Sequence, residues 1–439
     1  MAVFRLYVGS LHKPLILMIF NGHSVVFIYG VMNDRRNIRC FCFMQSCDGH
    51  QLGEKGFTVR TITVGLYFGK GDFESSMEEL HLLVSSAGGE VCATITGSRK
   101  APDAKYFIGS GKAEEVKLEV EMHHADMVVF NHSLSAAQQR NLEEKLGVSV
   151  MDRTGLILDI FSQRAVSHEG KLQVEMAKLD YFSSRLAGLW THLERQRGGI
   201  GVRGGMGESQ LEIDQRLIGD RRRSLQAALD KFQRQSQTQR RARTKGSRLN
   251  IALVGYTNAG KSTLFNHLTS ATAYAADQLF ATLDTTTRKV YVEGAGQVVI
   301  SDTVGFIREL PHQLVAAFRA TLEETVHADV LLHVVDAASD VRLDQIDEVN
   351  KVLKEIEADH VHQVLVWNKI DLTAHEAGIE RDEQGRIARI YVSAKTGAGM
   401  ADLREALVEL VDTQTPQWQK DKKKVDEDWS DDPRFRQID

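Results

Sequence analysis

The chain has 439 residues, of which 42% are hydrophobic and 26% are charged, and its formal net charge at pH 7 is −5. This length predicts two or three domains, each with enough chain to bury a core, and the composition is that of an ordinary soluble protein, not of a disordered or fibrous one. Four cysteines are too few for a disulfide framework, so we expect a reducing, cytoplasmic setting.

Residues 1–56 differ from the rest of the chain. Two apolar runs, 14–20 and 25–29, are separated by Asn-Gly-His-Ser, which makes the segment too broken for a membrane span. No small-residue cleavage site of a signal peptide follows it. We therefore predict a poorly ordered extension, with a peripheral membrane anchor as the less favoured alternative.

Strand-like and helix-like segments alternate over residues 57–167, which predicts an N-terminal α/β domain with a largely parallel sheet. Within it, the Gly-Ser-Gly-Lys of residues 109–112 resembles a phosphate-binding loop. Tyr106 stands where the first glycine of such a loop belongs and Ala113 replaces its serine or threonine, so we interpret 109–112 as a turn that opens a helix. The expected strands are 57–64, 90–96 and 126–130, and the expected helices are 74–87, 112–122 and 134–146.

Residues 168–248 show the seven-residue apolar spacing of a coiled coil. We predict two antiparallel helices joined by the glycine-rich loop 198–207. Because so much glycine disfavours a packed core and permits close backbone approach, we expect this loop to contact a partner. The heptad positions are Leu172, Leu179, Leu186 and Leu193 in the first helix and Leu211, Ile218, Leu225 and Phe232 in the second.

The second of these helices is strongly basic. Between Arg216 and Arg248 there are eleven lysines and arginines and two acids, a local charge of +9, which leaves −14 for the rest of the chain. A merely solvated helix face normally mixes both signs. The basic hairpin therefore predicts contact with a nucleic-acid backbone.

Residues 255–262 read Gly-Tyr-Thr-Asn-Ala-Gly-Lys-Ser, the G-x-x-x-x-G-K-S pattern of a phosphate-binding loop. An apolar strand-like run over 249–254 precedes the loop and a helical segment follows it, as this motif requires. We predict that the backbone N–H groups bind phosphate oxygens, that Lys261 reaches the terminal phosphates and that Ser262 coordinates Mg²⁺.

Three further motifs end predicted strands in the order typical of GTPases. Residues 302–305 form a D-x-x-G turn, whose aspartate can hold Mg²⁺ through a water and whose glycine N–H can sense a γ-phosphate. Residues 368–371 form an N-K-x-D motif, in which the carboxylate of Asp371 can accept the N1 and N2 protons of guanine. The Ser-Ala-Lys of 393–395 can support the guanine O6 through its backbone.

The segment 280–287 lies between the phosphate loop and the D-x-x-G turn, where the threonine that closes over Mg²⁺ and γ-phosphate is expected. By resemblance to related F-A-T-L patterns we choose Thr282, with 285–287 as alternatives. Phe306 occupies the position of the water-orienting glutamine of Ras-like switches, so we expect slow hydrolysis until a partner or a cation completes the site. Asn258 is a candidate ligand for such a cation, K⁺.

These motifs predict a multidomain α/β protein. The expected order is an extension over 1–56, an N-terminal α/β domain over 57–167, an antiparallel coiled-coil hairpin over 168–248, a doubly wound P-loop GTPase domain over 249–413 and a polar tail over 414–439. The expected cofactors are GTP or GDP and Mg²⁺, with K⁺ as a further candidate. The catalytic candidates are Lys261, Thr282 and Gly305, and the metal candidates are Ser262, Thr282 and Asp302. The nucleotide-binding candidates are Gly255, Tyr256, Thr257, Asn258, Ala259, Gly260, Lys261, Ser262, Thr263, Asp302, Thr303, Val304, Gly305, Asn368, Lys369, Asp371, Ser393, Ala394 and Lys395.

Several stretches outside the general GTPase motifs resemble the HflX family of ribosome-associated GTPases, and the resemblance covers about residues 60–413. It implies binding to the large ribosomal subunit, with the basic hairpin on ribosomal RNA and its glycine-rich tip near the peptidyl-transferase region. It also implies the GTP-dependent separation of stalled or idle ribosomes under stress. The matching stretches are 105–112, 139–143, 152–161, 168–175, 198–201, 210–212 and 279–284.

The chain departs from the family pattern in the hairpin tip and after the GTPase domain. Residues 203–208 read Arg-Gly-Gly-Met-Gly-Glu where the family has R-G-P-G-E, so a proline-fixed φ angle is lost. After residue 413 we expect a charged tail instead of the small C-terminal domain of many family members. The alternatives are an assembly or hibernation factor that uses GTP mainly to set its affinity, and an RNA-remodelling protein with ATP at the N-terminal domain.

Overall fold

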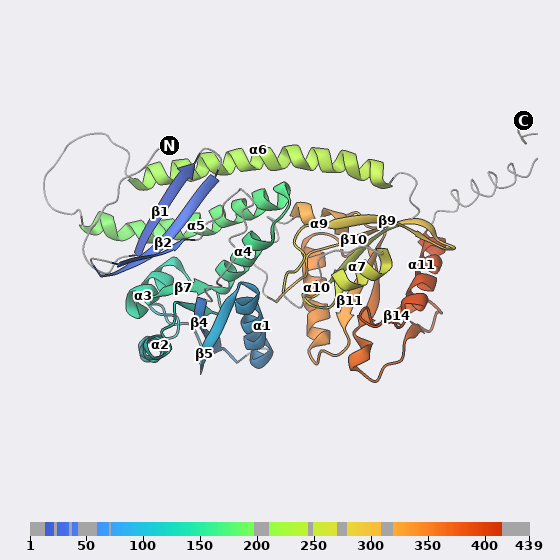
Figure 1. Ribbon diagram of the computed structural model, residues 1–439, viewed down its shortest axis with the longest axis horizontal. Coiled ribbons are helices and arrows are strands. Elements are labelled where there is room, and N and C mark those ends of the chain that lie inside the picture. Colours follow the sequence, from blue (N-terminus) through green and yellow to red (C-terminus); the bar gives the residue numbers. More distant parts are fainter. Residues whose placement is uncertain are drawn as a thin grey trace, which may run out of the picture. The chain divides into compact units, whose positions relative to one another are not determined.

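The computed structural model separates into two compact units (Figure 1). The first comprises Met1–Ile160 and Asp180–Ile218, and the second comprises Phe161–Leu179 and Gly219–Asp439. Each unit is considered by itself. The structure describes residues 14–21, 24–34, 37–42, 59–69, 72–196, 210–244, 249–269, 279–308 and 319–414.

The first unit contains a parallel four-stranded sheet with the strand order β5-β4-β6-β7, as the alternating pattern predicts. Ile62 and Val64 of the central strand are at most 1% exposed and pack with Val128 and Phe130 of its neighbour. The strands are β4 (Val59–Tyr67), β5 (Gly89–Ser98), β6 (Met127–Phe130) and β7 (Ser149–Asp152), and the helices between them are α1 (Phe73–Ser86), α2 (Ser110–His123) and α3 (Ala136–Leu146).

Short polar residues fix where these helices begin. The carboxylate of Asp72 accepts a hydrogen bond from the N–H of Ser75, and Ser135 and Gln138 form a reciprocal capping box at the start of α3. Residues 109–112, the phosphate-loop look-alike, open helix α2, and Gly109 has a φ of 85°. The segment is thus a helix-opening turn, as its missing first glycine indicates.

Within 1–56, where the sequence predicts a poorly ordered extension, the structure describes a three-stranded antiparallel sheet. Its strands are β1 (Pro14–Asn21), β2 (Ser24–Asp34) and β3 (Asn37–Cys42). The two apolar runs that look like a broken membrane segment are thereby the first two strands, since aliphatic residues and aromatics also favour paired strands. No helix among the described residues has both the length and the apolar character needed to cross a membrane.

Two long helices, α5 (His168–Gln196) and α6 (Gln210–Thr244), occupy the region of heptad spacing, after α4 (Arg153–Arg164). In the second unit their contacts are antiparallel, because the ring of His168 lies 5.2 Å from that of Phe232 while Glu175 pairs with Arg221 at 2.7 Å. The predicted tip, 198–207, lies outside the described residues, as do the side chains of Leu186, Leu193 and Leu211.

The second unit contains a seven-stranded sheet with the order β13-β14-β12-β11-β8-β10-β9, parallel except for its two edge strands. This is the doubly wound arrangement that the four GTPase motifs predict. The strands are β8 (Leu249–Gly255), β9 (Thr286–Val292), β10 (Gly296–Asp302), β11 (Val330–Asp336), β12 (His362–Asn368), β13 (Gly378–Arg381) and β14 (Ile387–Tyr391), and the helices are α7 (Lys261–Thr269), α9 (Arg319–Val326), α10 (Arg342–Glu355), the short 3-10 helix η1 (Ile370–Leu372) and α11 (Met400–Gln414).

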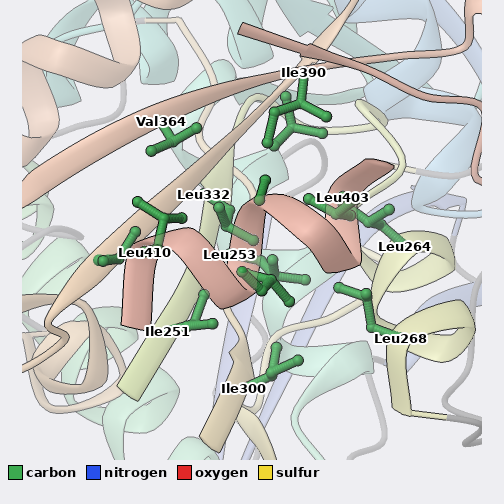
Figure 2. Close-up of a cluster of buried hydrophobic side chains, with 14 of the residues drawn as sticks. Ile251, Leu253, Leu264, Leu268, Ile300, Leu332, Val364, Ile390, Leu403 and Leu410 are labelled. Carbon is green, nitrogen blue, oxygen red and sulfur yellow. The ribbon is translucent and has the colours of Figure 1, made fainter. Parts of the chain in front are cut away.

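A single apolar cluster holds the two helices that flank the nucleotide loops against this sheet. Figure 2 shows Ile251 and Leu253 of β8 beside Leu264 of α7 and Leu403 of α11. All four side chains are at most 1% exposed. Their burial fixes the end of β8 and the start of α7, and therefore the loop between them.

His333 on β11 is a buried histidine behind the nucleotide loops, 1% exposed, with its Nδ1 at 2.5 Å from the amide nitrogen of Gln363. Burial, and secondarily the charge of Lys261, lowers the pKa of His333 to about 3. The imidazole is therefore neutral in the folded protein at pH 7, whereas an unfolded chain takes up a proton near pH 6.5.

We expect acid to destabilise the fold through His333. The folded pKa is depressed, so its contribution is fully present above about pH 6.5 and is lost as pH falls toward 3, at about 1.4 kcal/mol per pH unit. The free energy of unfolding, measured by denaturant titration, should fall by about 2 kcal/mol between pH 7 and pH 5 from this group. The variant His333→Gln should remove that part of the slope, while His362→Gln, at an exposed position on β12, should keep it. An equal slope in all three proteins would contradict the assignment.

Candidate functional site

The loop 255–262 joins the buried strand β8 to helix α7, and two glycines make its shape possible. Gly255 has a φ of 148° and a Cβ there would overlap the carbonyl oxygen of Val334. Gly260 has a φ of 92° and a Cβ there would overlap the side-chain amide of Asn368. Asn258 takes a φ of 60°, a left-handed conformation that asparagine tolerates. The loop consequently wraps close to its neighbouring strands.

Lys261, the first residue of α7, is 6% exposed. Its Nζ donates to the carbonyl oxygens of Gly255 at 3.1 Å and Tyr256 at 2.8 Å. Burial lowers the pKa of this lysine to about 8, and the nearby charge of Asp302 opposes that shift. Its ammonium group thus sits inside the loop, and an anion there would compensate the desolvated charge.

Ser262, Thr282 and Asp302 form an oxygen cluster at the mouth of the loop. The Ser262 hydroxyl lies 2.7 Å from that of Thr282 and donates to Oδ2 of Asp302 at 2.7 Å, and the Thr282 hydroxyl donates to the same carboxylate at 3.2 Å. Asp302 is fully buried, and burial raises the pKa of its carboxyl. Its Oδ1 is buried without a hydrogen-bond partner among the described residues. Hydroxyl and carboxylate oxygens with a spare acceptor are the donors that Mg²⁺ prefers.

The structure separates Thr282 from the other threonines that the sequence offers. Thr286 and Thr287 belong to strand β9, and the Thr287 hydroxyl lies 3.0 Å from that of Ser301. The Thr282 hydroxyl contacts both the Ser262 hydroxyl and the Asp302 carboxylate, which favours Thr282 as the metal candidate.

The loop opens into a cleft of about 430 Å³. Its lining includes Phe280 and Ala281, two residues of the F-A-T-L pattern that were not among the predicted binding residues. The Thr257 hydroxyl at its edge is buried without a hydrogen-bond partner among the described residues. The lining residues are Thr257, Asn258, Gly260, Lys261, Ser262, Thr263, Phe280, Ala281, Thr282, Thr303 and Gly305.

The D-x-x-G turn is fastened to the phosphate loop through its backbone. The N–H of Thr257 donates to the carbonyl of Phe306 at 2.7 Å, and the N–H of Phe306 donates to the carbonyl of Gly255 at 3.1 Å. The Phe306 ring is 1% exposed, so the position of a water-orienting glutamine is a buried apolar side chain. Thr303 donates to the carbonyl of Leu253 at 2.6 Å, which holds the turn from its other side.

The N-K-x-D and Ser-Ala-Lys motifs meet beside the phosphate loop. The Asn368 amide donates to the carbonyl of Ala259 and accepts from the N–H of Ala394, each at 2.9 Å. The Ser393 hydroxyl donates to the carboxylate of Asp371 at 2.6 Å. That hydrogen bond orients an otherwise exposed carboxylate, as a base reader requires.

Lys369 is held by a residue that the motifs do not include. It has a φ of 65°, and its ammonium pairs with Asp336 at 2.8 Å. Asp336 ends β11, the strand beside β12, and that position at the carboxyl edge of the sheet is the signal that could have found it. The backbone of Lys395 continues the loop from Ala394, and its side chain is exposed.

Comparison with known proteins gives three consecutive family matches. The families described as GTP-binding GTPase N-terminal, GTP-binding GTPase Middle Region and 50S ribosome-binding GTPase match residues 74–162, 164–243 and 250–369. The GTPase HflX of Escherichia coli (strain K12) is 52% identical over 82% of this chain and 84% of its own length. The chain belongs to the HflX family of GTPases. The GTPase HflX of Magnetococcus marinus is 51% identical over 75% of this chain and 76% of its own length.

As an HflX GTPase, the chain binds GTP and hydrolyses it. A GTP-binding protein of Sulfolobus solfataricus, solved in complex with GDP, aligns at 22% identity with a TM-score of 0.43, over 81% of this chain and 100% of that one. The curated relatives and the family matches, by contrast, confirm the sequence resemblance to HflX and the P-loop GTPase domain.

Replacing Asp371 by asparagine should change the preferred base. In the predicted role the carboxylate accepts two hydrogen bonds from guanine, and its loss would leave the N1 and N2 groups of the base unpaired at a cost of about 1–3 kcal/mol, which is about 5- to 150-fold in affinity. We expect weaker GTP binding and stronger xanthosine triphosphate binding in a titration with both nucleotides. The control Asp359→Asn, at an exposed position after α10, should bind as the parent does. Unchanged selectivity in Asp371→Asn would remove the base-reader assignment.

Proposed function

We propose that this chain is a ribosome-activated GTPase that binds the large ribosomal subunit and separates stalled or idle ribosomes into subunits under stress. The observation that carries the proposal is a GTPase site that lacks a water-orienting side chain at Phe306, in a chain that also presents a strongly basic helix. A site that is incomplete by itself calls for an activating partner. A basic surface on an otherwise acidic chain suits ribosomal RNA as that partner.

The polar atoms of the cleft fit GTP with Mg²⁺, and we assign their roles accordingly. Lys261 and the backbone N–H groups of 255–263 bind the phosphates, because the lysine is already desolvated inside the loop. Ser262, Thr282 and Asp302 hold Mg²⁺, which when bound neutralises phosphate charge. The remaining assignments are the Gly305 N–H to the γ-phosphate, Asn368, Lys369 and Asp371 to the base, and the backbone of Ser393, Ala394 and Lys395 to the guanine O6.

A monovalent cation bound at Asn258 would supply part of the positive charge that an activating partner would otherwise bring to the site. The side chain of this residue is exposed at the rim of the cleft, next to the loop that binds phosphates. A K⁺ ion there would stabilise negative charge that develops during phosphoryl transfer.

GTP turnover by the full chain should therefore be faster in K⁺ than in Na⁺ at equal ionic strength, because the smaller ion fits the same oxygen set less well. Asn258→Gly, which tolerates the left-handed φ of this position, should remove the difference between the two salts. Equal turnover in the two salts would eliminate K⁺ from the site.

The described part of helix α6 has one apolar face and one basic face. Leu225 and Leu229 are at most 9% exposed, whereas Lys231 and Arg234 are exposed. The helix thus packs through one side and keeps positive charge on the other, which supports binding to an RNA backbone.

Isolated large ribosomal subunits should stimulate GTP turnover by the purified chain by about 10³-fold, because completing a P-loop GTPase site from outside has an effect of that order. The double variant Lys231→Glu and Arg234→Glu should lose most of the stimulation and keep its basal rate. The control double variant Lys351→Glu and Lys354→Glu, the same charge change on the exposed face of α10, should be stimulated as the parent is.

The same assay distinguishes the alternative functions. Subunit binding without stimulation would overturn the activation proposal and favour an assembly or hibernation factor, in which GTP sets affinity. Stimulation together with dissociation of 70S particles into subunits, followed by sedimentation, is the result expected of a splitting factor. ATP turnover in place of GTP turnover would favour RNA remodelling through the N-terminal domain.

A further inference from the structure

The segment 280–284 connects the metal cluster to residues that precede the GTPase domain in the chain. Asp284 accepts three hydrogen bonds from the linker before helix α5: from the N–H of Val166 at 2.9 Å, the N–H of Ser167 at 2.7 Å and the hydroxyl of Ser167 at 2.5 Å. The Ser167 hydroxyl in turn accepts from the N–H of Gly170 at 2.8 Å. Ser167 therefore caps the start of the 29-residue helix α5, and the Asp284 carboxylate holds this capping residue.

The fit around Asp284 leaves no room for a side chain on the facing turn of α5. A Cβ at Gly170 would overlap Oδ1 of Asp284. The carboxylate accepts from the N–H of Ser167, directly before the first turn of α5, and negative charge near a helix N-terminus is favourable. Both partners therefore contribute to the contact: Asp284 supplies the carboxylate, Ser167 before the helix supplies donors, and Gly170 in the helix leaves the space.

A second contact holds the other end of the segment. The ring of Phe280 meets that of Phe161 of α4 edge to face, with 4.6 Å between centroids, and both rings are at most 2% exposed. Phe280 adopts a φ of 56°, a left-handed conformation that is rare for an aromatic residue and that the packing must maintain.

Thr282 lies between these two anchors. A single residue separates it from Phe280 and another from Asp284, and a residue of extended chain spans only about 3.3–3.6 Å. Thr282 thus cannot leave Ser262 and Asp302 by more than a few ångströms unless one of the anchors opens. The anchoring residues are Phe161 on α4 and Ser167 directly before α5. Both helices precede the first strand of the GTPase domain in the chain.

We propose that Asp284 and Phe280 are positioning residues for GTP hydrolysis, which hold Thr282 at the metal by fastening its segment to the end of α4 and the start of α5. The inference rests on the proposed role of Thr282 as a Mg²⁺ ligand. By linkage, a nucleotide that draws Thr282 into the site also stabilises the contact at the start of the hairpin helix, and the reverse holds equally.

The first test is Asp284→Asn in the full chain, assayed for GTP turnover without ribosomes. The amide keeps the shape of the side chain but loses the charge and one acceptor oxygen. We expect kcat to fall roughly 10- to 100-fold, the effect of a small misplacement, with GDP affinity unchanged and a higher Mg²⁺ concentration at half-maximal rate. Asp284→Glu should restore part of kcat, because the charge returns.

Asp329→Asn is the matched control, because it also removes a carboxylate that caps backbone. Asp329 accepts from the N–H of Asn250 at 2.7 Å, at the end of β8 away from the nucleotide loops. It should leave kcat and the Mg²⁺ requirement unchanged. Equal effects of the two variants would show that Asp284 is merely structural and would overturn the inference.

Ser167→Ala tests the contact from the helix side and is available if Asp284→Asn does not fold. It should lower kcat and raise the Mg²⁺ requirement, and the double variant should lose no more than the stronger single one, since both remove one interaction. In the parent, hydrogen exchange at the amides of Val166 and Ser167 should be slower with a GTP analogue and Mg²⁺ than with GDP. Nucleotide-independent exchange would contradict the linkage.

Thr282→Ala separates the failure of this inference from that of the assignment beneath it. If Thr282→Ala lowers kcat and Asp284→Asn does not, the positioning inference fails and the metal-ligand assignment stands. If neither variant lowers kcat, the assignment of Thr282 to Mg²⁺ fails first.

Discussion

The side-chain amide of Asn368 is the interaction on which the nucleotide site depends. It joins three loops, because its nitrogen donates to Ala259 in the phosphate loop and its oxygen accepts from Ala394 in the Ser-Ala-Lys loop. The amide is 2% exposed, and hydrogen bonds in such a setting are costly to leave unmade. Parallel strands bring the loops to one edge of the sheet, but they do not fix the distances between them. Asn368 does so, and Gly260 permits it by having no Cβ.

Burial of opposite charges then sets what the site can bind. Lys261 and Asp302 are both shielded from water. Burial lowers the pKa of the lysine and raises the pKa of the aspartate, and so disfavours the charged form of each. Neither residue is fully compensated by the other: the lysine donates to backbone carbonyls, and one oxygen of the aspartate has no hydrogen-bond partner among the described residues. A phosphate group beside Lys261 and a divalent cation beside Asp302 would stabilise the charged forms of both residues. This arrangement supports the proposal that the loop takes GTP together with Mg²⁺.

The sequence predicts the sheets and the ligand loops well because their signals are local. The pattern of residues 255–262 requires a strand before it and a helix after it, and β8 and α7 have those positions. The contacts of Asp284 could not be predicted, because they depend on which helix lies next to this residue in space, whereas the position of Asp336 at the end of a strand was an available signal. The strands within 1–56 were missed for a different reason. Apolar runs of seven and five residues are compatible with membrane contact, disorder or paired strands, and only pairing with neighbouring strands distinguishes them.

The contact at Asp284 gives the helical hairpin a physical connection to the chemistry at Thr282. Ser167, which binds Asp284, directly precedes His168, and the His168 ring packs against Phe232 of the basic helix α6. These contacts all lie within the second compact unit, so the connection requires no contact with the first. Contiguity alone does not establish coupling; an element with two arrangements must be biased at both ends. The segment 280–284 can be biased from both sides, because Thr282 at its centre contacts Ser262 while Phe280 packs on α4 and Asp284 accepts from the linker before α5. An RNA bound to α6, as proposed, would act on α5 through the contact between Phe232 and His168. It would then act on Thr282 through the hydrogen bond between Ser167 and Asp284.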